Sequence, residues 1–99
     1  MIQIIWEYKV KPEQAAKFEE AYGKNGEWDK LFKQSKAYKG TELVVKDLEN
    51  QVYMTIDSWK SLEQYEQFIQ KNSKEYKRLD KKFNNLTLEE KEIGIFNEE

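Results

Sequence analysis

The chain has 99 residues, of which 38% are hydrophobic, 36% charged and 14% aromatic, and it contains no cysteine and no histidine. This length fits a single domain, which we expect to span residues 1–99. Seventeen basic and nineteen acidic residues are mixed along the chain and give a formal net charge of −2, which disfavours nucleic-acid binding. We find no apolar run long enough to cross a membrane and no signal-peptide pattern, and expect a cytoplasmic protein.

The absence of histidine and cysteine excludes several kinds of catalytic and metal site. Without cysteine there is no thiolate nucleophile and no zinc-ribbon site. Without histidine, the Ser-His-Asp and Cys-His mechanisms, histidine-ligated haem and most transition-metal sites are excluded. We therefore expect no metal site. Any proton transfer depends on carboxylates, tyrosines, lysines and the single arginine, Arg78.

The N-terminal part of the sequence predicts a strand followed by two helices. Residues 2–10 alternate between two faces and are rich in β-forming side chains, which is typical of a strand. Pro12 favours the start of a helix that ends at Gly23. Trp28 and Phe32 share one side of a second, short helical segment.

The remaining sequence predicts a hairpin, a long helical stripe and a final strand. Residues 40–48 and 52–59 have strand patterns and are joined by a turn. Apolar side chains at helical spacing run over 62–86, with a break near Asn72. Residues 90–96 alternate again, with Ile93 and Ile95 on one face and Glu92, Gly94 and Phe96 on the other.

This order of elements predicts an α+β domain with the ferredoxin-like βαββαβ topology. In this fold an antiparallel sheet carries both helices on one face and leaves the other face uncovered. The second face is expected to carry Ile5, Val44, Tyr53 and Phe96. Because these side chains are apolar, pairing of two sheets in a homodimer would cover them.

Three carboxylates, Glu7, Glu42 and Asp57, are also expected on the second face, on neighbouring strands. Close carboxylates can raise one another's pKa and form a base or hold a cation. The alternative, which we prefer, is ion pairing with Lys9 and Lys46 across the dimer barrel.

Two segments resemble the antibiotic biosynthesis monooxygenase family. One is Thr55-Ile56-Asp57-Ser58-Trp59-Lys60-Ser61-Leu62-Glu63-Gln64-Tyr65, where a strand ends in Trp and is followed by Ser, an acidic residue and an aromatic residue on the next helix. The other is Trp6-Glu7-Tyr8-Lys9-Val10-Lys11-Pro12, where an alternating strand runs into Pro. The resemblance implies a dimeric α+β barrel with a pocket between the sheet and the helices of each subunit.

In the branch of this family that oxidises anthrone-like polyketides without a cofactor, the resemblance implies a catalytic role for Trp59, Tyr65 and Arg78. Thr55 stands where that branch has Asn. The structural alternatives are a Trp59 ring that closes the end of the core, a Tyr65 ring that is part of the core, and an Arg78 ion pair with Glu75. The haem-degrading branch is disfavoured, because its ligating histidine is missing.

The resemblance predicts a monooxygenase that acts on a small phenol, quinol or polyketide-like aromatic and needs no cofactor. Trp6, Trp28, Phe32 and Thr55 are the candidate substrate-binding residues. The alternatives are a dimeric protein that binds a small hydrophobic metabolite without chemistry, and a structural dimer whose pocket is filled by its own rings. The free volume near Trp59 distinguishes an open pocket from a filled core.

Overall fold

The computed structural model of the chain describes residues 1–97. Residues 98 and 99 of the predicted domain lie outside the described residues. The elements in chain order are β1 (Ile2–Val10), the 3₁₀ turn η1 (Pro12–Gln14), α1 (Ala15–Tyr22), α2 (Glu27–Phe32), β2 (Tyr38–Asp47), β3 (Val52–Trp59), α3 (Leu62–Lys71), α4 (Ser73–Phe83), the 3₁₀ turn η2 (Asn84–Leu86) and β4 (Thr87–Asn97).

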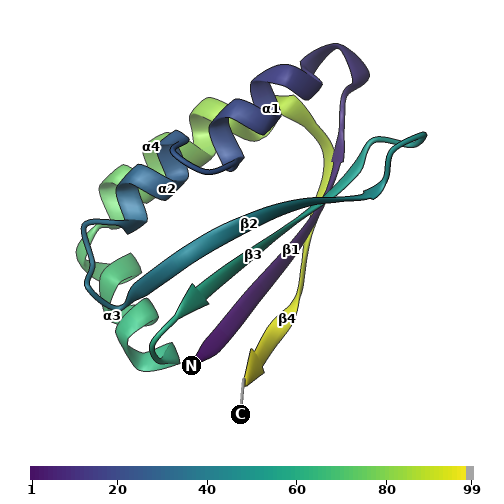
Figure 1. Cartoon of the computed structure of the whole chain (residues 1–99). Coiled ribbons are helices and arrows are strands. Elements are labelled where there is room, and N and C mark those ends of the chain that lie inside the picture. The colour runs from purple at the N-terminus through teal and green to yellow at the C-terminus, as the bar shows by residue number, and fades with distance from the viewer. Residues whose placement is uncertain (98–99) are drawn as a thin grey trace.

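The four strands form one antiparallel sheet in the order β2-β3-β1-β4. The helices lie together on one side of this twisted sheet, and α3 lies near the end at which β1 begins (Figure 1). The predicted ferredoxin-like α+β fold is therefore confirmed. Among the described residues, no helix has the length and apolar composition that a membrane crossing requires.

Several predicted boundaries agree with the structure because local chemistry sets them. β1 and β3 have the predicted bounds. Pro12 lies at the first position of η1, and Asn72 separates α3 from α4 at the predicted break. The Ser61 hydroxyl accepts a hydrogen bond from the backbone N–H of Gln64 at 3.2 Å and caps α3. In contrast, β2 and β4 begin earlier than predicted, at Tyr38 and Thr87.

The core lies between the sheet and the helices and is dominated by aromatic rings. Trp59 and Phe18 are completely buried, and Ile4, Val10 and Leu79 are almost so. The rings of Phe18 and Tyr22 stack with their centroids 4.3 Å apart. Such pairs add stabilisation beyond the burial of their area.

The register of β3 corrects one prediction about the uncovered face of the sheet. Tyr53 pairs with Tyr8 and is 2% exposed, so its ring lies on the helix side. Alternation along β3 explains this, because Tyr53 has the same parity as Thr55 and the buried Trp59. Ile5, Val44 and Phe96 are on the outer face as expected. Their partners in the sheet, Ile56, Met54 and Gln3, alternate with the residues that face the helices.

A β-bulge in β4 corrects a second prediction. Ile5 pairs with Gly94, but the next residue, Trp6, pairs with Glu92, so Ile93 is an extra residue in β4. A bulge shifts the alternation of one strand relative to its partner. Glu92 therefore lies on the helix side of the sheet, and so does Glu90, which pairs with Tyr8.

Candidate functional site

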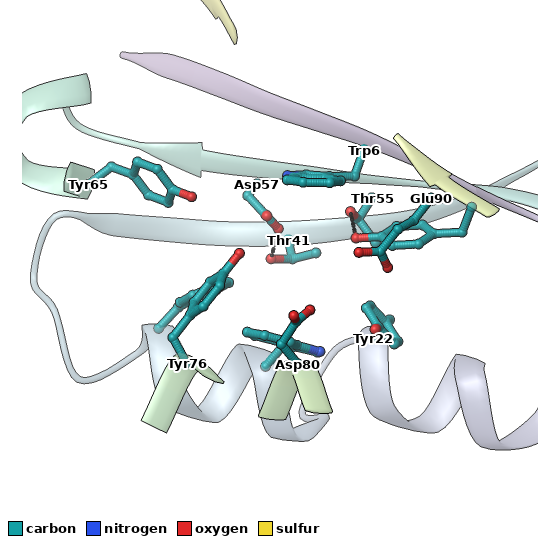
Figure 2. Close-up of a pocket in the computed structure, with 12 residues that line it drawn as sticks. Trp6, Tyr22, Thr41, Thr55, Asp57, Tyr65, Tyr76, Asp80 and Glu90 are labelled. Atoms are coloured by element: carbon teal, nitrogen blue, oxygen red, sulfur yellow. Dashed lines mark hydrogen bonds between the residues drawn. The ribbon is translucent and has the colours of Figure 1, made fainter. Parts of the chain in front are cut away.

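A cavity lies between the helix-facing side of the sheet and the helices, and side chains from most elements of the fold line it (Figure 2). Its volume is about 40 Å³, a few times the ~10–15 Å³ that one ordered water requires. The lining residues are Trp6, Tyr8, Tyr22, Trp28, Phe32, Thr41, Thr55, Asp57, Tyr65, Tyr76, Asp80 and Glu90. This is a narrow cavity with aromatic walls and carboxyl groups inside it.

A larger groove of about 510 Å³ runs over the outside of the molecule, along α1, α2 and η2. It is lined mainly by exposed polar and charged side chains, and the Lys82–Glu27 ion pair at 2.8 Å belongs to its lining. We place the candidate site in the narrow cavity instead, because polar groups converge there among aromatic rings, which is typical of ligand sites.

Asp57 lies on the sheet side of the cavity. It follows Thr55 in β3 by two residues, so both side chains face the helices, and it pairs with Ile4 on one side and Thr41 on the other. Thr41 Oγ1 lies 2.6 Å from Asp57 Oδ1. Burial raises the pKa of the Asp57 carboxyl to about 6, although the hydrogen bond from Thr41 opposes this. A carboxyl with this pKa exchanges its proton close to neutral pH.

This position of Asp57 corrects the prediction of three carboxylates on the outer face. Glu7 and Glu42 do lie there, because they pair with Met54 and Ile56. Glu7 forms an ion pair with Lys46 at 2.5 Å, and the hydrogen bond to this lysine lowers the pKa of Glu7. Glu7 thus pairs with a lysine that the alternative named, but within one chain rather than across a dimer. The alternation of β3 turns Asp57 to the opposite side of the sheet.

Two tyrosine hydroxyls point into the space in front of Asp57 (Figure 2). Tyr65 comes from α3 and Tyr76 from α4. Burial raises the pKa of Tyr65 above its usual range and that of Tyr76 to about 12. Both hydroxyls are therefore protonated at neutral pH and can donate a hydrogen bond to an oxygen atom of a bound molecule.

Two further carboxyl groups, Asp80 and Glu90, face the same space from α4 and β4 (Figure 2). Burial, followed by the charge of Asp80, raises the pKa of Glu90. No lysine or arginine lines the cavity in the described part of the chain. When these carboxyl groups are ionised the cavity carries negative charge, and when they are protonated it is neutral. Either state favours proton-accepting chemistry over the binding of an anion.

Aromatic rings from β1 and α2 form the walls. Trp6 lies over the sheet side of the cavity (Figure 2). On the helix side, the Trp28 ring contacts Tyr76, with centroids 5.1 Å apart, and Phe32 at 5.8 Å. Near the far end, the Tyr8 hydroxyl lies 3.3 Å from Thr55 Oγ1. Such rings suit a planar apolar molecule held against polar groups.

Five of the seven residues that the sequence singled out line this cavity: Trp6, Trp28, Phe32, Thr55 and Tyr65. Trp59 does not, because its ring is fully buried between those of Tyr38 and Phe68. The ring centroids are 5.2 and 5.4 Å from that of Trp59. Its ring closes the end of the core, as in the structural alternative.

Arg78 is also outside the cavity. Its guanidinium is exposed and makes two hydrogen bonds to Glu75, from Nε and from Nη2, each 3.0 Å long. The two residues are three apart on α4 and therefore lie side by side on its outer surface. This is the ion pair given as the structural alternative, and it places Arg78 apart from the other predicted site residues.

Sequence reasoning missed several lining residues: Tyr8, Tyr22, Thr41, Tyr76, Asp80 and Glu90. Tyr76 and Asp80 are four residues apart, and this spacing on one helix face was a signal that could have linked them. Glu90 had no such signal, because the bulge at Ile93 turns it toward the cavity.

The model of the antibiotic biosynthesis monooxygenase family matches residues 1–81 of this chain. No protein among those of curated function matches it significantly.

Solved structures with the same fold cover nearly the whole chain. SnoaB, a cofactor-independent oxygenase from Streptomyces nogalater solved as a mutant, superposes with a TM-score of 0.79 at 12% identity, covering 98% of this chain and 91% of that one. A candidate antibiotic biosynthesis monooxygenase from Bordetella bronchiseptica gives a TM-score of 0.77 at 21% identity, with coverages of 99% and 96%. At these identities the superpositions establish the fold.

Proposed function

Because the chain belongs to the antibiotic biosynthesis monooxygenase family, we propose that it is a cofactor-independent monooxygenase of a small, electron-rich aromatic compound such as a phenol or quinol. The observation that carries this proposal is the convergence of the Asp57 carboxyl and the Tyr65 and Tyr76 hydroxyls on one cavity with aromatic walls. It combines a base, two hydrogen-bond donors and a surface for a planar ring.

In the proposed reaction, Asp57 removes a proton from the substrate while Tyr65 and Tyr76 donate hydrogen bonds to the oxygen on which negative charge develops. The resulting anion is electron-rich and transfers electrons to dioxygen. One oxygen atom becomes a carbonyl at the ring carbon opposite the phenolic oxygen. The hydrogen of that carbon and the hydroxyl proton that Asp57 removed leave with the other oxygen atom as water, and a quinone results. The protein binds, deprotonates and excludes water.

The dimensions of the cavity bear on the choice of substrate. A volume of about 40 Å³ is well below the ~300 Å³ and more that is typical of ligand pockets. A single ring is therefore favoured over a fused polyketide, and the rings of Trp28 and Tyr76 have to move aside when it binds.

A second candidate is a protein that binds a small hydrophobic molecule without transforming it. The small volume by itself favours the third alternative, a structural dimer whose pocket is filled by its own rings. Aromatic walls serve binding and catalysis equally, and Thr55 stands in place of the Asn of the resembling branch. The two candidates differ in one measurable respect, because only the monooxygenase consumes oxygen.

We also propose that the working form is a homodimer that pairs the outer faces of two sheets. Ile5, Met54 and Ile56 are partly buried on this face, and Val44 and Phe96 are 37% and 46% exposed. An apolar sheet face of this kind is commonly covered by a partner.

The test is a titration of tryptophan fluorescence with substituted hydroquinones and anthrone, followed by oxygen-electrode measurements with each compound that binds. The monooxygenase predicts saturable quenching together with oxygen uptake that Asp57→Asn abolishes. Tyr53→Phe is the matched control, because its hydroxyl donates to Glu19 at 2.5 Å outside the cavity. Binding without oxygen uptake would support the second candidate.

A further inference from the structure

Asp57 is connected to a second carboxyl through two hydroxyl groups, those of Thr41 and Tyr38. Thr41 Oγ1 lies 2.6 Å from Asp57 Oδ1 and in close contact with the Tyr38 hydroxyl. The Tyr38 hydroxyl in turn lies 2.6 Å from Asp29 Oδ1. Three close oxygen–oxygen contacts thus join four oxygen atoms in an unbroken row from β3 through β2 to α2.

At the far end of the row, Asp29 is buried, and protein donors compensate its charge. Asp29 is 3% exposed. Its Oδ2 accepts a hydrogen bond from the backbone N–H of Asn25 at 2.9 Å and pairs with Lys33 Nζ, also at 2.9 Å. The Lys33 side chain is half exposed, so this end of the row is adjacent to solvent.

The three contacts in the row need one proton more than its two hydroxyl groups supply. Three hydrogen bonds require three protons, but the Tyr38 and Thr41 hydroxyls supply only two. If both carboxyls are ionised, Tyr38 donates to Asp29 and Thr41 donates to Asp57, and the contact between the two hydroxyls has no proton in it. One additional proton, on either Asp57 or Asp29, satisfies all three contacts.

We infer that the Thr41 and Tyr38 hydroxyls form a proton-conducting row between Asp57 and Asp29, and that the two carboxyls hold one proton in common. With the proton on Asp57, each group donates to the next in the direction of Asp29. With the proton on Asp29, every hydrogen bond is reversed and Asp57 presents a carboxylate to the cavity.

The change between these two arrangements conserves every atom. The Asp57 proton moves to Thr41, the Thr41 proton to Tyr38 and the Tyr38 proton to Asp29, so each oxygen gives up one bond to hydrogen as it forms another. If the proposed function holds, the Asp57 carboxylate then accepts the substrate proton, the electron pair of the broken bond stays on the substrate, and Asp29 releases its own proton to solvent beside Lys33.

The charges around the row favour the arrangement with the proton on Asp57 at rest. Burial, and also the charge of Asp29, raise the pKa of Asp57. Burial acts in the same direction on Asp29, but hydrogen bonds from Tyr38, Lys33 and the Asn25 N–H outweigh it and lower the pKa of Asp29. The carboxyl that faces the cavity is thus the one that keeps the proton.

The other titratable groups that line the cavity with Asp57 do not supply a competing cation. They are Tyr8 on β1, Tyr22 on α1, Tyr65 on α3, Tyr76 and Asp80 on α4, and Glu90 on β4. Tyrosines are neutral near pH 7, and the carboxyls add only negative charge, which raises the proton affinity of Asp57.

The test is the pH titration of the aspartate carboxyl carbons by NMR, with the whole chain labelled at its four aspartates and no substrate present. If the row shares a proton, the Thr41 proton is committed to Tyr38. Tyr38→Phe then releases it to stabilise ionised Asp57, and the Asp57 midpoint falls by about one pH unit, the size of one net hydrogen bond. An unchanged midpoint in Tyr38→Phe would overturn the inference.

Thr41→Val provides a second test that does not depend on the folding of the Tyr38 variant. It removes the hydroxyl that links Asp57 to Tyr38 but keeps the contact between Tyr38 and Asp29. A shared proton therefore predicts that Asp57→Asn shifts the Asp29 midpoint less in the Thr41→Val background than in the wild type. An equal shift in both backgrounds would contradict the inference. Tyr53→Phe, which removes a buried hydroxyl outside the row, is expected to leave the Asp57 midpoint unchanged; an equal shift there would also contradict it.

These titrations separate the inference from the proposed function. They need no substrate, so the absence of oxygen uptake leaves the shared proton intact and removes only its role in catalysis. If instead the midpoints fail to move while oxygen uptake is observed, Asp57 acts as an isolated base and the row is structural.

Discussion

Thr41 and Asp57 stand opposite each other in the β2–β3 ladder, and their side-chain oxygens are 2.6 Å apart. The pair lies where the cavity meets the row of hydroxyls that leads to Asp29. The hydrogen bond fixes one oxygen of Asp57 and leaves the carboxyl positioned toward Tyr65 and Tyr76. The ionisation of Asp57 therefore affects both the pH dependence of stability and the chemistry proposed for the cavity.

Asp57 is expected to make stability depend on pH in a direction that is unusual for a carboxylate. The folded state raises its pKa from 3.8 to about 6, so between these values the folded protein binds a proton that the unfolded chain has lost. Asp57 therefore makes its full contribution to the free energy of unfolding below about pH 4, and this contribution is lost as pH rises through about 6.

In Asp57→Asn, the free energy of unfolding relative to the wild type should increase by up to about 3 kcal/mol between pH 4 and pH 7. Urea unfolding at the two pH values measures this difference. Asp47→Asn is the matched control, because hydrogen bonds from Asn50 lower the pKa of Asp47 and give the opposite sign. A constant difference for Asp57→Asn would contradict the raised pKa.

If Asp57 is the base, oxygen uptake with a phenolic substrate should follow its ionisation. A base acts in its deprotonated form, so kcat/KM is expected to rise through about pH 6. Tyr65→Phe should keep this midpoint but lower kcat about 10- to 100-fold, because one donor to the developing oxyanion is lost. A rate that is flat between pH 5 and pH 8 would exclude Asp57 as the base.

Trp59 is expected to act on stability rather than on substrate. Trp59→Ala removes a fully buried ring and should lower the free energy of unfolding by about 3–5 kcal/mol. Trp59→Phe keeps a ring against Tyr38 and Phe68 and should cost less. Chemical denaturation measures both, and ligand binding by the folded Trp59→Phe variant should remain close to that of the wild type.

Arg78 is expected to be dispensable for both stability and binding. Both side chains of its ion pair with Glu75 are exposed, and solvent screening leaves such pairs with little effect on stability. Arg78→Gln should therefore shift the thermal midpoint little and leave fluorescence quenching unchanged. A tenfold weaker ligand affinity in this variant would show that the guanidinium reaches the ligand in the bound state.

The outer face of the sheet is expected to form the dimer interface. Ile56 pairs with Ile5 at the centre of this face, so Ile56→Lys places a charge in the proposed contact and should convert a dimer to a monomer. Sedimentation at micromolar concentration measures this. Leu48→Lys, at the exposed hairpin turn, should leave the dimer intact. A monomeric wild type would contradict the interface.

Much of the fold follows from the sequence because its signals are local. The alternation in β1 and β3 gave their exact bounds, Pro12 marked the start of the first helical segment, and Asn72 marked the break between α3 and α4. Each signal depends on the preferences of a few adjacent residues for one backbone conformation. The order of elements then left the ferredoxin-like topology as the natural arrangement.

The site itself was decided by tertiary structure. The extra residue Ile93 in β4 turns Glu90 and Glu92 to the helix side, although simple alternation places them with Gly94. The row from Asp57 to Asp29 joins side chains of three separate elements, which no local pattern connects. The sequence by itself determined which elements form; register and packing between distant segments decided which carboxyls face the cavity, because those depend on contacts that local preferences do not encode.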